Sequence, residues 1–432
     1  NLKVKKTNEK KKKKLLDHYN NGRYAKAEET AKNIIKKFPD DNFSWMILAL
    51  IMKDTNRFKD SLKASKKSIE LSPKDSVALN VHGIILLELK KYTEAENYFK
   101  ESINLNPKLA EAYNNLGLVY NNLGLTEKAQ EYYLKAISLK ENLFEAYHNL
   151  GEIFEKKNKF DEAIQCQNKA ISLKPDYDKA FSSLGTIFYK MNKIEESKMY
   201  FGKAANLNPN NLQAKYMYSA LIGENITSAP REYVEKLFDD FSAFFDGHLI
   251  GQLKYTAPKL IGDILKKNYM NNVSGTVLDL GCGTGLIGEE LDDVCAKLVG
   301  VDLSKSMIEK ARQKKIYDEL VYDDIEEYLN REILNFDIII ASDVLIYVGD
   351  LIKIFKSLKQ NKKTNAKFVF TTEHNHSVNS YKIEKSGRFS HSKKYIDDLC
   401  QQFQFKQEKF EIFDMRNDST STIAGGLYIL GL

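Results

Sequence analysis

The sequence predicts an α/β protein in which an all-helical repeat array precedes a domain with a mostly parallel sheet. Three observations predict this division. Prolines in the first half recur at intervals of 34 residues or twice 34, whereas from Val273 onward short apolar segments alternate with helical ones. In addition, one apolar segment runs directly into a glycine-rich turn, which is typical of a ligand site at a sheet edge.

The length and composition indicate a globular protein of more than one domain. The chain has 432 residues, of which 43% are hydrophobic and 29% are charged. Its longest apolar run, 45–52, is too short to cross a bilayer, which takes about 20 residues, and no signal peptide is visible. We expect a cytoplasmic protein without membrane contact. The cysteines are scattered without metal-ligand spacing, so we expect neither disulfides nor a bound metal: they are Cys166, Cys282, Cys295 and Cys400.

A basic segment opens the chain, and it contributes much of the net charge of +6. Its lysines are Lys3, Lys5, Lys6 and the run 10–14. No aromatic residue is interleaved with them, whereas binding of single-stranded nucleic acid commonly uses such residues for stacking. We therefore expect residues 1–7 to form a solvated basic tail, and we expect no nucleic-acid partner.

A repeated pattern extends over residues 8–222. Each copy combines an aromatic residue, Leu-Gly, a second aromatic residue and later alanines, and the clearest copy contains Tyr113, Leu116, Gly117, Tyr120, Ala129, Tyr133 and Ala136. Small residues let two helices approach closely, and a proline ends the second helix. Prolines stand at Pro39, Pro73, Pro107, Pro175 and Pro209. Full copies are expected to start near Asn42, Ser76, Ala110, Phe144 and Asp178, after a degenerate one.

The period and residue types of this pattern resemble tetratricopeptide repeats (TPRs). The resemblance implies stacked helix pairs with a concave groove, which we expect to bind a protein or peptide or to join two copies of the chain. A structural spacer is the alternative. Amides can bond a peptide backbone without demanding a sequence. We expect such amides on or near the groove from Asn114, Asn115, Asn121, Asn122 and Asn149.

The two parts of the chain are expected to meet at a short linker. A helix over 212–222 caps the array, and residues 223–230, GENITSAP, form the predicted linker. The segment that follows is rich in aromatic residues, of which Phe238, Phe241 and Phe245 have helical spacing and are expected to pack in a core. Tyr255 lies in a short polar loop, and we expect it to face a ligand.

The candidate ligand site starts at a predicted buried strand, 276–280. The turn after this strand contains Gly281, Gly283 and Gly285, which allow the backbone to approach a ligand closely. The N–H groups of the next helix point back at this turn. A second strand, 297–301, ends in Asp302, at the edge where α/β folds hold ribose hydroxyls.

The same turn also satisfies a competing pattern. Residues 283–288 match G-x-G-x-x-G, the fingerprint of dinucleotide-binding proteins. Asp279 separates the two interpretations, because a carboxylate two residues before the first glycine opposes a pyrophosphate but suits an ammonium group. A nicotinamide-dependent dehydrogenase is therefore the disfavoured alternative.

The later elements complete an alternating pattern, which indicates a parallel sheet with helices on both faces. Further strands are predicted at 320–322, 337–341 and 367–370, and helices at 305–314, 325–331, 349–359 and 393–402. The last two strands, 410–414 and 424–430, have no helix between them. They are therefore expected to form an antiparallel hairpin.

The run D-x-G-C-G-T-G with a downstream G-V-D resembles the first two motifs of class I S-adenosylmethionine-dependent methyltransferases. The whole chain resembles bacterial methyltransferases that carry N-terminal TPRs. The resemblance implies a Rossmann-like, seven-stranded domain over 231–432, with an N-terminal lid over 231–262 and S-adenosyl-L-methionine as cofactor. The closing hairpin resembles the seventh-strand arrangement of that family.

The resemblance also implies a role for each strand end. Asp279 would hold the methionine ammonium group, and Asp302 would accept both ribose hydroxyls. Asp324 would accept from the adenine amino group, with Asp323 as the alternative match. Further cofactor contacts are expected from Gly281, Cys282, Gly283, Gly285, Leu303, Met307, Ile325, Ser342, Asp343 and Tyr255.

The expected reaction is methyl transfer to an oxygen or nitrogen of an unidentified acceptor. The sulfonium methyl group is already activated, so a general base is needed only if the acceptor must lose a proton. His374 and His391 are the predicted bases, and Arg388 and Tyr347 are predicted substrate contacts, with Arg388 clamping an acidic group. A TPR scaffold whose cofactor-binding domain is inactive is the alternative function.

Overall fold

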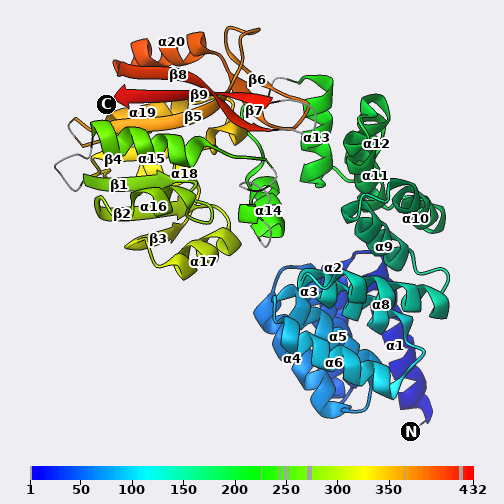
Figure 1. The fold of residues 1–432 in the computed structure, drawn as a ribbon. Coiled ribbons are helices and arrows are strands. Elements are labelled where there is room, and N and C mark those ends of the chain that lie inside the picture. Colours follow the sequence, from blue (N-terminus) through cyan, green and yellow to red (C-terminus); the bar gives the residue numbers. More distant parts are fainter. Residues whose placement is uncertain are drawn as a thin grey trace. The chain divides into compact units, whose positions relative to one another are not determined.

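The structure is a computed structural model, and it describes residues 2–224, 226–242, 245–247, 251, 253–269, 275–363, 365–417 and 422–432. The chain forms two compact units, Asn1–Lys193 and Ile194–Leu432 (Figure 1). The first unit is helical, and the second contains a twisted sheet with helices on its faces. Among the three phenylalanines expected to pack in a core, the side chain of Phe241 lies outside the described part of the chain.

The first unit consists of antiparallel helix pairs, as the 34-residue period predicts. The pairs begin at Asn42, Ser76, Ala110, Phe144 and Asp178, which confirms the predicted starts. The helices are α1 (Leu2–Asn20), α2 (Tyr24–Lys37), α3 (Asn42–Asp54), α4 (Phe58–Leu71), α5 (Ser76–Glu88), α6 (Tyr92–Leu105), α7 (Ala110–Asn122), α8 (Thr126–Leu139), α9 (Phe144–Lys156), α10 (Phe160–Leu173) and α11 (Asp178–Lys190). The lysines of the basic segment fall within α1, so that segment is helical.

The repeated spacing between a glycine and a later aromatic residue is explained by packing. A Cβ atom on Gly117 would lie 2.6 Å from the ring of Tyr133, and one on Gly83 would lie 2.6 Å from the ring of Phe99. Both rings are fully buried between the two helices of a pair. Glycine in the first helix therefore makes room for the aromatic ring of the second.

The asparagines predicted to face a peptide instead connect parts of the repeat array. The side-chain amide of Asn115 donates to Asn80 at 3.0 Å, and that of Asn149 donates to Asn114 at 2.9 Å. These four side chains are buried. Asn121 accepts from Lys156 at 3.1 Å, and Asn122 donates to the carbonyl oxygen of Leu118 at 2.8 Å. The amides of Asn114, Asn115 and Asn149 are thus engaged within the chain, whereas Asn122 is exposed.

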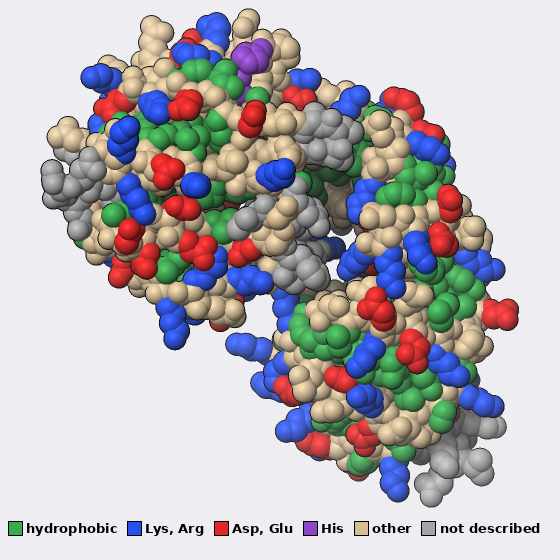
Figure 2. All heavy atoms as spheres, viewed as in Figure 1, with side chains coloured by type: hydrophobic (Ala, Val, Ile, Leu, Met, Phe, Trp, Pro, Cys, Tyr) green, Lys and Arg blue, Asp and Glu red, His purple; other side chains and the backbone are tan. Residues whose placement is uncertain are grey.

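The surface of the repeats carries charges of both signs. Figure 2 shows Lys and Arg side chains interspersed with Asp and Glu side chains on the face in view. Several of them form ion pairs between neighbouring helices, such as Arg57 with Glu28 at 2.5 Å and Lys140 with Glu111 at 2.6 Å. None of the helices within the described ranges has the length and hydropathy needed to span a bilayer.

The second unit begins before the predicted linker. It includes α12 (Ile194–Leu207) and α13 (Leu212–Ile222), although the repeat pattern continues through both helices. Residues of the predicted linker are fixed by hydrogen bonds to the sheet unit. The carbonyl oxygen of Thr227 accepts from Gly349 and Asp350 at 2.8 and 2.9 Å, and Ala229 donates to the carbonyl oxygen of Tyr347 at 2.9 Å.

The remaining elements build the sheet and its helices. The helices are α14 (Arg231–Phe241), α15 (Ala257–Asn268), α16 (Leu286–Leu291), α17 (Lys305–Lys314), α18 (Ile325–Arg331), the 3-10 turn η3 (Leu345–Tyr347), α19 (Ile352–Asn361) and α20 (Lys393–Phe403). The strands are β1 (Gly275–Leu280), β2 (Cys295–Asp302), β3 (Glu319–Tyr322), β4 (Ile338–Ala341), β5 (Lys367–His374), β6 (Tyr381–Ile383), β7 (Phe389–His391), β8 (Lys406–Asn417) and β9 (Thr422–Gly431).

The strand order is β3-β2-β1-β4-β5-β7-β6, and β9 pairs with β5 and β8. Strands β1 to β5 are parallel, whereas β9 is antiparallel to both of its neighbours, which confirms the predicted closing hairpin. The hairpin β6–β7 was not predicted. Strand β7 pairs only with the last two residues of β5, Glu373 and His374, so the hairpin extends the sheet near the carboxyl ends of the parallel strands.

Alternation along the strands divides the core into two layers. Leu278 and Leu280 of β1 point into the layer that contains α18, α19 and α20, whereas Val277 points into the layer that contains α15 and α16. Both faces are apolar, and this explains the continuous apolar strand segments of the sequence. The loops at the carboxyl ends of the strands are consequently the place where polar side chains gather.

Candidate functional site

A cavity of about 400 Å³ lies in the second unit, at the carboxyl ends of the parallel strands. Its floor is formed by the loops after β1, β2, β3 and β4, and the predicted lid contributes Phe238, Phe245, Leu253 and Tyr255 to its wall. The predicted site residues that it brings together are Tyr255, Asp279, Gly281, Cys282, Gly283, Asp302, Leu303, Asp324, Ile325, Ser342, Asp343, Tyr347 and Arg388.

The glycine turn after β1 has a shape that side chains would not permit. Gly281, Gly283 and Gly285 have φ angles of +67°, +54° and +94°. A Cβ atom on Gly281 would lie 2.5 Å from Cγ2 of Val344, a residue of the cavity wall. Glycine therefore lets this turn pack against the loop after β4 and line the cavity with backbone atoms.

Two buried carboxylates lie beside this turn. Asp279 is 1% exposed, and Tyr317 donates a hydrogen bond of 2.6 Å to it. Asp302 accepts from the backbone N–H groups of Gly283 and Ser304, each at 2.8 Å. Burial raises the pKa of Asp279 to about 7 and that of Asp302 to about 6, against the opposing effect of these hydrogen bonds. Both groups would therefore gain from a ligand that brings positive charge or hydroxyl donors.

The two neighbouring aspartates in the loop after β3 have different surroundings. Asp324 lines the cavity and caps α18 by accepting from the N–H groups of Glu326 and Glu327 at 2.8 and 3.3 Å. Asp323 instead bonds the guanidinium group of Arg331 at 2.8 Å. Only Asp324 of this pair is part of the cavity wall among the described residues.

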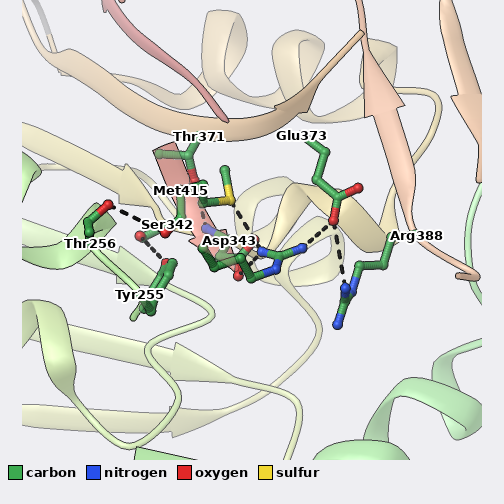
Figure 3. Close-up of polar contacts among 9 residues, drawn as sticks. Tyr255, Thr256, Ser342, Asp343, Thr371, Glu373, Arg388 and Met415 are labelled. Carbon is green, nitrogen blue, oxygen red and sulfur yellow. Dashed lines mark hydrogen bonds and ion pairs between the residues drawn. The ribbon is translucent and has the colours of Figure 1, made fainter. Parts of the chain in front are cut away.

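The loop after β4 carries a buried ion-pair network (Figure 3). Arg416 of β8 binds both carboxylate oxygens of Asp343, at 2.7 and 2.6 Å, and also pairs with Glu373 of β5. Asp343 has a φ of +55°, and its N–H group donates to Thr371 at 2.9 Å. Sequence reasoning missed Arg416 and Glu373. The available signal was an arginine in the closing hairpin, but its partners are far away in sequence.

The other polar groups of this part of the wall are two tyrosines and a second arginine. The hydroxyl groups of Tyr255 and Ser342 lie 2.9 Å apart. Arg388 lies 3.9 Å from Glu373 (Figure 3). Burial alone would lower the pKa of Arg388, but Tyr347, Glu373 and Asp343 outweigh this effect and raise it. Arg388 consequently stays charged.

The two predicted catalytic histidines are placed elsewhere, and this corrects the prediction. His391 is fully buried, and its Nε2 atom lies 3.0 Å from the carbonyl oxygens of Val348 and Gly349. Burial lowers the pKa of His391 to about 4, although the two carbonyl groups oppose this. Its role is to hold the loop after η3. Within the described part of the cavity wall, no histidine is present.

His374 fails as a base for a different reason. Side chains alternate along a strand, so its neighbour Glu373 faces the ion-pair network while His374 packs near Phe410, with 5.6 Å between ring centroids. His376 lies 4.3 Å from the His374 ring by the same measure. Two predicted cofactor contacts also lie outside the cavity wall as described: Met307 is fully buried, and Gly285 caps α16.

Comparison with family models gives matches over both parts of the chain. Residues 271–417 match a model described as methyltransferase domain. Models described as tetratricopeptide repeat match residues 13–76, 76–142, 108–176 and 179–211. The methyltransferase match contains every strand that contributes to the cavity.

Curated relatives that are similar to part of this chain include O-methyltransferases. The malonyl-[acyl-carrier protein] O-methyltransferase of Bacillus cereus is 27% identical over 143 residues, which cover 32% of this chain and 52% of that protein. The ubiquinone biosynthesis O-methyltransferase of Coxiella burnetii is 35% identical over 100 residues, which cover 22% and 42%. The chain thus spans about half the length of the curated relatives it matches, or less.

Solved structures match the helical part. Pseudomonas aeruginosa pilF has a TM-score of 0.41 and 18% identity, over 49% of this chain and 96% of that protein. A thermophilic TPR protein of Thermus thermophilus has a TM-score of 0.39 and 18% identity, over 42% and 98%.

Proposed function

We propose that this chain, which combines tetratricopeptide repeats with a methyltransferase domain, transfers the methyl group of S-adenosylmethionine to an oxygen or nitrogen atom of an acceptor. The carrying observation is that Asp279, the glycine turn, Asp302 and Asp324 line one cavity at the carboxyl ends of four parallel strands. We call these residues the cofactor side of the cavity. Ser342, Asp343, Tyr347, Arg388 and Arg416 form its acceptor side.

The cofactor side suits a sulfonium nucleoside by charge and shape. Asp279 would hold the ammonium group, and its raised pKa supports this role because a cationic ligand would relieve the cost of burying its charge. Asp302 would accept the ribose hydroxyls, and Asp324 the adenine amino group. At Gly281 the absence of a side chain lets the turn pack directly against Val344 of the cavity wall. When bound, the cofactor supplies an activated methyl group.

The acceptor side supports transfer by orientation. Burial raises the pKa of Tyr255 well above its usual value, so its hydroxyl group is not suited to remove a proton at neutral pH. Both carboxylate oxygens of Asp343 are bound by Arg416. A buried wall that excludes water and holds the acceptor against the methyl group would supply the rate enhancement. This favours an acceptor that arrives already deprotonated.

We further propose that the repeats recruit a protein or peptide partner or join two copies of the chain. Stacked repeats commonly bind along their concave surface. Asn115 and Asn149 donate to other buried asparagines, so contacts with a partner would come from other side chains.

Calorimetry with S-adenosylhomocysteine and with NAD tests the cofactor assignment. We expect micromolar affinity for the first and none for the second, and loss of binding in Asp302→Asn. Binding of NAD alone would refute the proposal. Transfer of a labelled methyl group to cell extract, separated into protein and small-molecule fractions, then tests catalysis. Tight cofactor binding without transfer to either fraction would favour the inactive scaffold.

A further inference from the structure

The acceptor side contains two arginines with unequal surroundings. Arg416 binds both oxygens of Asp343 and pairs closely with Glu373. Arg388 makes a longer contact of 3.9 Å with the same oxygen of Glu373, beyond hydrogen-bond range. The two carboxylates of this wall are thus held mainly by Arg416. Arg388 and Arg416 together balance the charges of these two carboxylates, and within the described part of the chain Arg388 makes no hydrogen bond to either of them.

Arg388 is placed at the cavity by the turn between β6 and β7. Glu384 and Arg388 close this turn through a backbone hydrogen bond of 2.8 Å, and Gly387 within it has a φ of +76°. The carbonyl oxygen of Gly387 accepts from the hydroxyl group of Tyr216 in α13, at 2.7 Å, and Tyr216 is buried. The backbone next to Arg388 is therefore fixed before any ligand arrives, which lowers the entropy cost of binding one.

The surroundings of Arg388 combine carboxylates with aromatic side chains. Tyr347 lies next to it and is one cause of its raised pKa. Phe238, whose ring centroid is 5.4 Å from that of Tyr347, and Ile346 also line the cavity. The side chain of Arg388 is 32% exposed, so a ligand in the cavity can reach it, and the planar fork of its donors matches an oxyanion.

From these contacts we propose that Arg388 and Tyr347 form a subsite for an oxyanion, a carboxylate or phosphate, carried by an acceptor with an otherwise apolar body. The subsite rests on the proposed function, because it assumes that the acceptor occupies this side of the cavity. It identifies a class of substrate: small acidic molecules, or acidic groups on a carrier, with an aromatic or aliphatic portion against Phe238.

The oxyanion bound by Arg388 could belong to the acceptor or to the cofactor, because S-adenosylmethionine has a carboxylate of its own. The comparison of S-adenosylhomocysteine with methylthioadenosine, which lacks the amino-acid portion, distinguishes them. If Arg388 binds the acceptor, Arg388→Met should change the affinity for both compounds by less than about threefold. A selective loss of more than tenfold for S-adenosylhomocysteine would assign Arg388 to the cofactor and overturn the proposal.

The direct test uses the full-length protein saturated with S-adenosylhomocysteine and titrated with benzoate, phenylphosphonate and benzamide. These probes share an aromatic ring and differ in charge. We expect at least one of the two anions to bind about tenfold more tightly than benzamide, as one charge-assisted contact would give. The better anion indicates whether a carboxylate or a phosphate is preferred. Equal affinity of all three would overturn the proposal.

Variants assign the preference to Arg388. In Arg388→Met the preference for the anion should disappear, whereas Lys385→Met, which removes an equal charge from an exposed position of the same turn, should retain it. Arg388→Lys keeps the positive charge but loses the planar guanidinium donors, so we expect a reduced preference for the anion in this variant. It replaces the methionine variant in the test if Arg388→Met does not fold. A preference that survives in Arg388→Met would overturn the proposal. Failure of the wild type to bind S-adenosylhomocysteine would instead refute the proposed function.

Discussion

The two sides of the cavity are built in different ways. On the cofactor side, the polar groups come from consecutive strand ends, and their partners include backbone N–H groups of the adjoining loops: Asp302 bonds Gly283 and Ser304, and Asp324 caps the helix that it precedes. On the acceptor side, Asp343 is held by the side chain of Arg416, which is 73 residues away. The first arrangement relies largely on backbone groups at the strand ends, and the second relies on an ion pair between distant segments.

This difference predicts which property, ligand binding or stability, is affected by substitutions on each side. Cofactor-side changes should act on ligand binding, because those groups contact the cavity from a sheet edge that is already stable. Acceptor-side changes should act on the fold itself, since a buried ion pair that loses one member leaves an uncompensated charge. The following experiments test this distinction.

The largest effect is expected from Arg416→Met. The change leaves Asp343 and Glu373 buried without their close partner, and we expect a loss of about 3–5 kcal/mol in the free energy of unfolding. Urea denaturation followed by circular dichroism measures it. The control is Lys394→Met, which removes an exposed ion pair at 3.0 Å with Asp398 and should cost less than about 1 kcal/mol. Similar losses in both variants would contradict the role given to Arg416.

Gly281→Ala should give the next largest effect, on binding rather than on folding alone. The φ of +67° costs about 1–2 kcal/mol for a residue with a side chain, and the new Cβ would also collide with Val344. We expect the affinity for S-adenosylhomocysteine, measured by calorimetry, to fall at least tenfold.

Two glycine controls separate the causes. Gly124→Ala has a φ of +74° with open space around it, so it tests strain without collision. In Gly275→Ala the new Cβ atom would lie 3.6 Å from its nearest neighbour, so this variant adds a methyl group to β1 without backbone strain and without a collision. Both should bind S-adenosylhomocysteine as the wild type does. Weakened binding of S-adenosylhomocysteine in Gly275→Ala would show that any added methyl group in or near β1 impairs binding. The effect of Gly281→Ala could then not be assigned to the shape of the glycine turn.

The sequence predicted the local features well and the long-range ones poorly. Repeat starts such as Ser76 and Ala110 follow from a period within one helix pair, and the predicted α17 and α18 have the observed bounds. Strands β6 and β7 have three residues each, too few for a periodic signal, and so the position of Arg388 beside the cavity followed from resemblance only. His374 shows the remaining difficulty. Neighbouring residues of a strand point to opposite faces of the sheet, so Glu373 faces the ion-pair network at the cavity while His374 packs near Phe410.

The pH dependence of cofactor binding sharpens the comparison further. Asp279 must be ionised to hold an ammonium group, and its pKa is raised to about 7 without ligand. The affinity for S-adenosylhomocysteine should therefore fall about tenfold from pH 8 to pH 6, as measured by calorimetry in buffers of matched ionisation enthalpy. An affinity that is constant over this range would mean that Asp279 is already charged in the free protein.

The same shifts predict the sign of the change in stability. The pKa values of Asp279 and Asp302 in the folded protein lie above their values in the unfolded chain, so protonation favours the folded state. Their contribution to stability is full below about pH 4 and is lost as the pH rises through 6 and 7. Bound S-adenosylhomocysteine should therefore raise the unfolding temperature more at pH 8 than at pH 5.

The smallest effect is expected from Tyr317→Phe, which removes one hydrogen bond to Asp279. That bond of 2.6 Å lowers the pKa of Asp279, so its loss should raise the pKa further and move the midpoint of the pH-dependent affinity upward. At pH 7 we expect about three- to tenfold weaker binding, which corresponds to the loss of one charge-assisted hydrogen bond. Tyr328→Phe changes a tyrosine of the opposite core layer and is the matched control. If the midpoint stays in place while affinity falls, Tyr317 acts through packing against Gly288 and Gly300 rather than through the carboxylate.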